Sequence, residues 1–274
     1  MAAVAMQSQE VALVSPASLA GVLGVALLAY LLLMAGWALI MRLLGVRLGA
    51  RAILEGYLLS FLPRYIPGTV WGYFGRNEWL AREHGVGYRR TSTGSVIEVV
   101  MLVATCGTLI VAWMWPGWSG ALAAVTLLVA AGVGTLLAVR RLAGDTAVAD
   151  GGIAWVTWAT VAAIDLSFWA MHGLATALVA AAIGAGSGVS LWSFVVSFAA
   201  SWLAGFVVVF VPAGLGVRES VLGDLLARSG AFSPGQPALI AVLGRLFMVL
   251  AELLFLAVGL ALMLGKRREL QKGS

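Results

Sequence analysis

The sequence predicts an all-α, multi-pass membrane protein with a single domain over residues 1–274. Hydrophobic residues make up 62% of the chain and charged residues only 11%, and the mean hydropathy is +1.01. A soluble domain carries about 25% charged residues. Several apolar stretches reach the roughly 20 residues with which a helix crosses a bilayer, and none alternates like a membrane β-strand. The fold class that follows is a polytopic helical bundle.

Five stretches are long and apolar enough to be complete crossings. In chain order they are residues 19–41, 93–115, 120–139, 152–174 and 238–264. Residues 1–18, which carry one charge at Glu10, are expected to form a short tail outside the cell, and residues 265–274 a basic cytoplasmic tail.

Two further apolar regions are interrupted. Residues 52–82 break at Pro67-Gly68, because proline removes a donor and ends a helix while glycine permits the turn. Residues 190–228 break at the sequence PAGLG (212–216). After each break a half-helix is expected to start, near Thr69 and near Val217.

The basic residues predict the orientation, since short cytoplasmic loops collect Lys and Arg. They form four clusters: Arg42, Arg47 and Arg51; Arg76, Arg82, Arg89 and Arg90; Arg140 and Arg141; and Lys266, Arg267, Arg268 and Lys272. Placing all four inside makes both interrupted regions re-entrant hairpins of opposite orientation, with the C-terminus in the cytoplasm. The alternative for the first region is one helix kinked at Pro67, which would place four arginines outside.

The breaks suggest a site for anions. A broken helix at membrane depth is tolerated only where it is buried in protein or faces a water-filled cavity, and a free helix N-terminus attracts anions. Arg218, in the first turn after the second break, suits phosphate because its guanidinium is a planar fork of donors. The alternative is that the glycines only permit close packing.

Ionisable residues in apolar regions are costly in lipid and should face the protein interior. They are Glu55, Arg64, Glu98, Asp165, His172, Arg218, Glu219, Arg245 and Glu252. Two pairs, Arg245 with Glu252 and Asp165 with His172, are seven residues apart, which places each pair on one helical face. For Glu55, Glu98 and Glu252, structural ion pairing with a buried arginine is an equal alternative to a functional role. His172 is interpreted as an interfacial or satisfied histidine near a helix end.

No motif for a nucleophile, a metal or a nucleotide occurs. The single cysteine, Cys106, lies in an apolar run and cannot form an intramolecular disulfide. The sequence therefore predicts no cofactor, no metal, no nucleic-acid partner and no enzymatic activity.

The stretch FLPRYIPGTVWGYFGR (61–76), Glu98 in SVIEVV (95–100), and VPAGLGVRESVL (211–222) followed by a helix bearing Arg245 resemble the lysylphosphatidylglycerol synthase transmembrane family. This family is also called the flippase-like domain. The resemblance implies a plasma-membrane domain that handles anionic lipids, either flipping aminoacylated phospholipid or serving polyprenyl-phosphate-linked sugar pathways. The site candidates that it implies are Arg64, Pro67, Gly68, Trp71, Arg76, Glu98, Gly214, Gly216, Arg218, Glu219 and Arg245.

The chain departs from the family pattern in two ways. Nothing after residue 264 could be a soluble aminoacyl-transferase domain, so synthase activity is not expected, and the chain starts with what resembles the second helix of the family. The expected function is binding and translocation of an anionic lipid or a polyprenyl-phosphate-linked substrate. There are two alternatives, a membrane partner subunit of a glycosyltransferase and an integral transferase in lipid-linked glycan or aminoacyl-lipid synthesis. A glycosyltransferase and a second copy of the chain are the expected protein partners.

Overall fold

The computed structural model describes residues 16–66, 71–143 and 151–272, and every regular element in these ranges is helical. Five of these helices are long and apolar enough to cross a membrane. They are α1 (Pro16–Leu43), α4 (Tyr88–Met114), α5 (Trp118–Ala143), α6 (Gly151–Ala182) and α9 (Gln236–Lys272). The predicted all-α fold and its five long apolar helices are confirmed, although α6 and α9 continue beyond the predicted ends.

The first interrupted region breaks earlier than predicted. It consists of α2 (Ala50–Leu58), the 3₁₀ helix η1 (Leu62–Tyr65) and α3 (Trp71–His84). The prediction that the incoming helix ends at Pro67 was wrong, because α2 stops well before it. Pro63 explains the difference: in a continued helix it could not donate to the carbonyl of Leu59, and its ring would clash with that carbonyl. Pro67 and Gly68 lie outside the described residues.

The second interrupted region has the predicted boundaries. α7 (Leu191–Val207) begins after Ser190, whose hydroxyl accepts a hydrogen bond of 3.2 Å from the amide of Ser193, and α8 (Val217–Ala227) ends beside Arg228. Between them lies η2 (Pro212–Gly214). The backbone there is left-handed at Ala213, Gly214 and Gly216, with φ of 50°, 67° and 80°. Glycine adopts this conformation without strain, so the chain reverses where the glycines predicted it.

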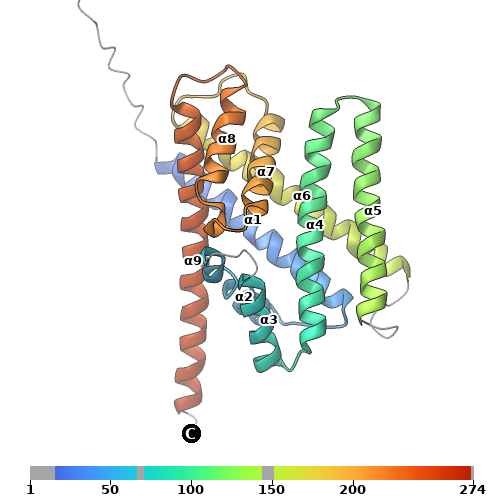
Figure 1. Ribbon diagram of the computed structural model, residues 1–274. Helices are drawn as coiled ribbons and strands as arrows, with labels where there is room; N and C mark the ends of the chain where they lie inside the picture. The colour runs from blue at the N-terminus through green and yellow to red at the C-terminus, as the bar shows by residue number, and fades with distance from the viewer. Residues whose placement is uncertain (1–15, 67–70, 144–150, 273–274) are drawn as a thin grey trace, which may run out of the picture.

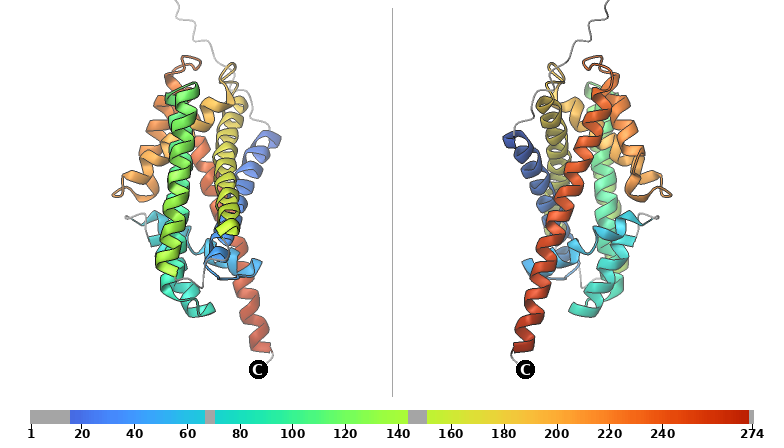
Figure 2. Two further views of the ribbon diagram at one scale, coloured as in Figure 1. Left: turned by 90° about the vertical axis from the view of Figure 1, so that its right-hand side faces the viewer. Right: turned by 90° about the vertical axis from the view of Figure 1, so that its left-hand side faces the viewer.

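The two interrupted regions lie at opposite ends of the bundle and meet in its middle. In Figure 1, α2 and α3 occupy the lower half and α7 and α8 the upper half, and η1 contacts η2 between them. Both side views in Figure 2 show one region above the other. None of these four helices crosses the full height of the bundle.

The helix ends that carry basic residues lie together. Figure 1 shows the C-terminal ends of α1, α3, α5 and α9 at the lower end of the molecule. Arg42 is in the last turn of α1, Arg82 in that of α3, and Arg140 and Arg141 in that of α5. Arg228 is an exception, since it follows α8 at the upper end, where its Nε lies 2.8 Å from Asp224. The prediction that Arg76 lies in a cytoplasmic cluster with Arg82 was wrong, because its side chain is completely buried and pairs with Glu98.

The main core is formed by α1, α4, α6 and α7, with further buried side chains from α2, α3 and α9. The side chains of Trp37 and Trp169 are almost completely buried in it. At Gly173 an added Cβ would lie 2.5 Å from the Cα of Val195, so only glycine lets α6 and α7 approach this closely. α5, by contrast, exposes large apolar side chains such as Leu122 and Val125, as expected of a helix that faces lipid.

Candidate functional site

A central cavity of about 80 Å³ lies where the two interrupted regions meet. Since one buried water needs about 10–15 Å³, the cavity has room for a small polar group. Its walls come from both interrupted regions and from α1, α4, α6 and α9. The lining residues are Tyr30, Leu33, Tyr57, Tyr65, Tyr73, Leu102, Phe168, Trp202, Phe206, Ala213, Arg218, Arg245, Met248 and Glu252.

A smaller inner cavity of about 30 Å³ adjoins the central cavity. Arg218, Arg245, Trp202 and Met248 line both cavities. The inner cavity is further lined by four polar residues, which are His172 and Thr176 on α6, Ser201 on α7 and Glu219 on α8. The two cavities are therefore neighbours that share both arginines.

Two glycines make room for Arg218. A Cβ at Gly205 would overlap the Cγ of Arg218, and a Cβ at Gly214 would lie 2.9 Å from its Nε. The guanidinium carbon of Arg218 lies 5.6 Å from the centre of the Trp202 ring, within cation–π range. The second break thus positions Arg218 in the wall of both cavities.

Arg245 reaches the same place from α9. Its Nη2 donates a hydrogen bond of 3.1 Å to the carbonyl of Ala213, which lies in the bend. Its Nε lies 3.6 Å from Oε1 of Glu219, an ion pair without a hydrogen bond, and within the described residues neither atom has another hydrogen-bond partner. Both atoms therefore keep hydrogen-bonding capacity for a molecule in the cavity.

The N-terminus of α8 is less open than predicted. Oε2 of Glu219 accepts a hydrogen bond of 2.5 Å from the amide of Gly216, the residue that precedes the helix. A carboxylate from the first turn is a favourable neighbour for the positive end of a helix dipole. One amide that the sequence suggested for a bound anion is therefore satisfied by the protein itself.

Glu252 is held by two tyrosines. Oε1 accepts a hydrogen bond of 2.7 Å from the hydroxyl of Tyr30 on α1, and Oε2 accepts one of 2.7 Å from the hydroxyl of Tyr65 in η1. The prediction that Arg245 and Glu252 share one face of their helix is confirmed, because both line the central cavity. Glu252 thus connects the first interrupted region to α9.

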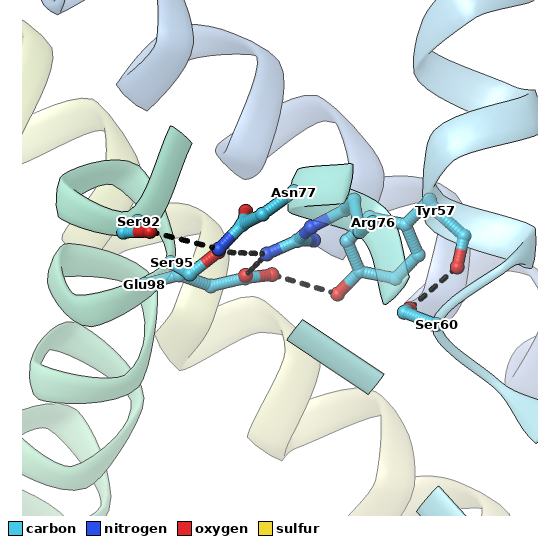
Figure 3. Close-up of polar contacts among 7 residues, drawn as sticks. All are labelled: Tyr57, Ser60, Arg76, Asn77, Ser92, Ser95 and Glu98. Carbon is cyan, nitrogen blue, oxygen red and sulfur yellow. Dashed lines mark hydrogen bonds and ion pairs between the residues drawn. The ribbon is translucent and has the colours of Figure 1, made fainter. Parts of the chain in front are cut away.

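A second polar cluster joins α3 to α4 (Figure 3). The buried guanidinium of Arg76 forms an ion pair with Glu98 through Nη2, which also lies 3.1 Å from the hydroxyl of Ser95. That hydroxyl donates to Oδ1 of Asn77 at 3.1 Å. The guanidinium carbon of Arg76 lies 4.4 Å from the centre of the Trp37 ring.

Tyr57 connects this cluster to the central cavity. Its ring lines the cavity, and its hydroxyl donates a hydrogen bond of 2.9 Å to Oε1 of Glu98 (Figure 3). Arg76 and Glu98 themselves do not line the central cavity. Structural pairing, the alternative considered for Glu98, therefore describes its contacts.

The structure brings together part of the predicted site. Arg218, Arg245 and Glu219 line the two cavities, and Gly214 and Gly216 form the bend beside them. The indole of Trp71 is about half exposed at the start of α3 and lines neither cavity. The side chain of Arg64, together with Pro67 and Gly68, lies outside the part of the chain that the structure describes.

The sequence did not predict the tyrosines. Tyr30 and Tyr65 lie 222 and 187 residues from Glu252 in the chain, so no spacing could connect them. The interpretation of His172 as a residue near a helix end was wrong, because α6 continues to Ala182 and the ring of His172 is only 1% exposed. The prediction that it shares an inward face with Asp165 is confirmed, since both side chains are buried.

Among the described residues, no group of three or more His, Cys, Asp or Glu side chains is arranged to hold a metal ion. Comparison of the chain with protein-family models, with curated proteins and with solved structures finds no match. A proposal about function therefore depends on the geometry of the two cavities.

Proposed function

We propose that this protein binds the phosphate group of an anionic lipid in the central cavity and moves that lipid across the plasma membrane. The observation that carries the proposal is the placement of Arg218 and Arg245, from two different helices, in the wall of one cavity in the middle of an apolar bundle. Arginine in such a place is costly unless it has a partner, and its fork of donors suits phosphate.

The arrangement of the interrupted regions supports a transporter. We infer that in the membrane the first region enters from the cytoplasm and the second from outside, so that their bends meet near the midplane. Discontinuous helices that meet at this depth are the recurrent layout of transporter sites. The contact between η1 and η2, and the basic helix ends on one side of the bundle, agree with this topology.

A lateral groove supports a lipid rather than a free anion. It is lined by Tyr73, Phe74, Asn77, Ser92, Ser95, Val96, Val99, Val100 and Phe206 and has a volume of about 290 Å³. Tyr73 and Phe206 also line the central cavity, so groove and cavity are neighbours. The exposed side chains of Phe74, Val96 and Val100 make the groove apolar at its outer edge. It fits the hydrocarbon chain of the lipid whose headgroup occupies the cavity.

The proposed transport needs no covalent chemistry. The resemblance of the two interrupted regions to the flippase-like domain family agrees with this proposal. Both acyl-chain phospholipids and polyprenyl phosphates have the required chemistry, which is a phosphate next to a long hydrocarbon chain.

The test is lipid movement in vesicles. Purified protein is reconstituted in vesicles that contain phosphatidylglycerol with a fluorescent label on one acyl chain. An impermeant reductant then bleaches the label in the outer leaflet. The proposal predicts that the wild-type protein and Arg228→Ala expose the inner-leaflet label, whereas Arg218→Ala and Arg245→Ala do not. Arg228 is the matched control because it is an exposed arginine of the same hairpin.

Two results would contradict the proposal. One is bleaching of the inner leaflet by both cavity variants at the wild-type rate. The other is an inner-leaflet label that stays protected with the wild-type protein, combined with co-purification of the protein with a glycosyltransferase, which would favour the partner-subunit alternative. A labelled glucosylceramide, which lacks phosphate, should not move in the same vesicles.

A further inference from the structure

The buried histidine of α6 presents one unused nitrogen in the inner cavity, which shares Arg218 and Arg245 with the central cavity. His172 lines the inner cavity, and within the described residues its Nε2 has no hydrogen-bond partner. Its Nδ1 lies 3.1 Å from the carbonyl oxygen of Phe168. A carbonyl can only accept, so Nδ1 carries a proton and donates. In the neutral ring Nε2 is then an acceptor with a lone pair.

An acceptor is the wrong partner for a phosphate oxygen. Two lone pairs repel, whereas a protonated Nε2 would donate a charge-assisted hydrogen bond to the same oxygen. Since Phe168 fixes Nδ1 as a donor, only protonation of Nε2 makes His172 complementary to phosphate.

The charges around the ring lead to the same conclusion. Among the described side chains that line the two cavities, two arginines balance two glutamates. A third positive charge beside the two guanidinium groups is unfavourable while the cavities hold no anion. A bound phosphate adds one negative charge and makes a positive charge on His172 favourable.

The neighbours of the ring hold it in place. It stacks on Phe198 of α7 with ring centres 4.7 Å apart, and its centre lies 5.8 Å from that of Tyr30 on α1. The titratable and charged groups on the elements packed around it are Tyr30 on α1, Arg218 and Glu219 on α8, and Arg245 and Glu252 on α9. On α6 itself, the buried Asp165 lies seven residues earlier.

We propose that His172 is a proton-binding residue of the lipid site, which takes up a proton on Nε2 when a phosphate group enters and donates a hydrogen bond to it. This inference rests on the proposed function. The proton comes from solvent, and no covalent bond of the lipid forms or breaks. Lipid binding and proton binding then strengthen each other, and the lipid binds more tightly as the pH falls.

The test measures proton uptake directly. Dihexanoyl phosphatidylglycerol is titrated into the full-length protein in a calorimeter at several pH values between 6 and 8, in buffers with different heats of ionisation. This probe is a phosphodiester, whose charge does not change in that range. For the wild-type protein we expect net proton uptake and an affinity that rises about threefold to tenfold per unit of falling pH, tenfold being the limit for one coupled proton.

Two variants separate the role of Nε2 from folding. His172→Asn keeps an amide donor for the carbonyl of Phe168 but has no counterpart of Nε2, and His172→Gln offers a neutral amide farther from the backbone. Both variants should bind the probe without proton uptake, and their affinity for it should not change with pH. His84→Gln is the matched control, because His84 is the other of the two histidines in the chain and lies exposed in the last turn of α3. It should behave like the wild-type protein.

The outcomes distinguish this inference from the proposed function. Binding by the wild-type protein without proton uptake would overturn the role of His172 and leave the lipid site intact. Unchanged uptake in both His172 variants would also overturn it and would assign the proton to Glu219 or Glu252. Failure of the wild-type protein to bind the probe at any pH would overturn both proposals.

Discussion

Arg76 and Glu98 form a buried ion pair between α3 and α4, with side chains that are 0% and 4% exposed. Removal of one partner from such a pair leaves an uncompensated buried charge. We therefore expect Glu98→Gln to destabilise the protein by about 3–5 kcal/mol, measured as thermal stability in detergent.

The matched control for this variant is Glu78→Gln on α3. It breaks an exposed ion pair with Arg82 of α3 and should change stability little. The double variant Arg76→Gln with Glu98→Gln should recover part of the loss. A Glu98→Gln protein of wild-type stability that no longer moves lipid would instead assign the pair to substrate binding.

The two tyrosines on Glu252 predict a second effect on stability. A hydrogen bond to a charged group contributes about 1.5–3 kcal/mol, so Tyr30→Phe and Tyr65→Phe should each cost an amount in this range. In a double-mutant cycle with Glu252→Gln, each tyrosine should show a coupling energy of about 0.5–3 kcal/mol. Additive losses would mean that these hydroxyls do not stabilise the carboxylate.

Gly205 predicts a loss of function through crowding. In Gly205→Ala the new methyl group would overlap the side chain of Arg218, which must then leave its position in the cavity wall. We expect lipid movement to fall at least as far as in Arg218→Ala, while the protein still folds. Gly24→Ala is the control, since a Cβ there meets no atom within 4 Å. Wild-type transport by Gly205→Ala would show that the position of Arg218 is unimportant.

The topology can be tested with single cysteines. Cys106, the only cysteine of the chain, is buried and should not react with an impermeant maleimide. Arg89→Cys and Arg141→Cys should both react from the cytoplasmic side, and Ser187→Cys from the outside. Reaction of Arg89→Cys from outside would mean that the first interrupted region crosses the membrane completely.

The sequence predicted the fold well because the membrane imposes long apolar helices. The bend at Pro212–Gly216 was also predictable, since Gly214 and Gly216 adopt a backbone conformation that few other residues tolerate. The end of α2 was not predictable, because two prolines, Pro63 and Pro67, follow it in the sequence. Either proline can end a helix, and only the structure distinguishes them.

The site was predicted less completely than the fold. Arg218 and Arg245 were identified because an arginine in an apolar helix is conspicuous. The pairing of Arg76 with Glu98 and the tyrosine contacts of Glu252 depend on which helices are neighbours, and periodicity along one helix does not contain that information. The role inferred for His172 depends on a hydrogen bond to the carbonyl of Phe168 on the same helix, which fixes the tautomer.

The most direct test of the central claim is an experimental structure of the protein in a bilayer that contains phosphatidylglycerol. We predict a phosphate group in the central cavity, with oxygens at hydrogen-bond distance, about 2.7–3.2 Å, from the guanidinium groups of Arg218 and Arg245, and a hydrocarbon chain in the lateral groove. A map in which the cavity holds no headgroup, while lipids surround only the outer surface of the bundle, would contradict it.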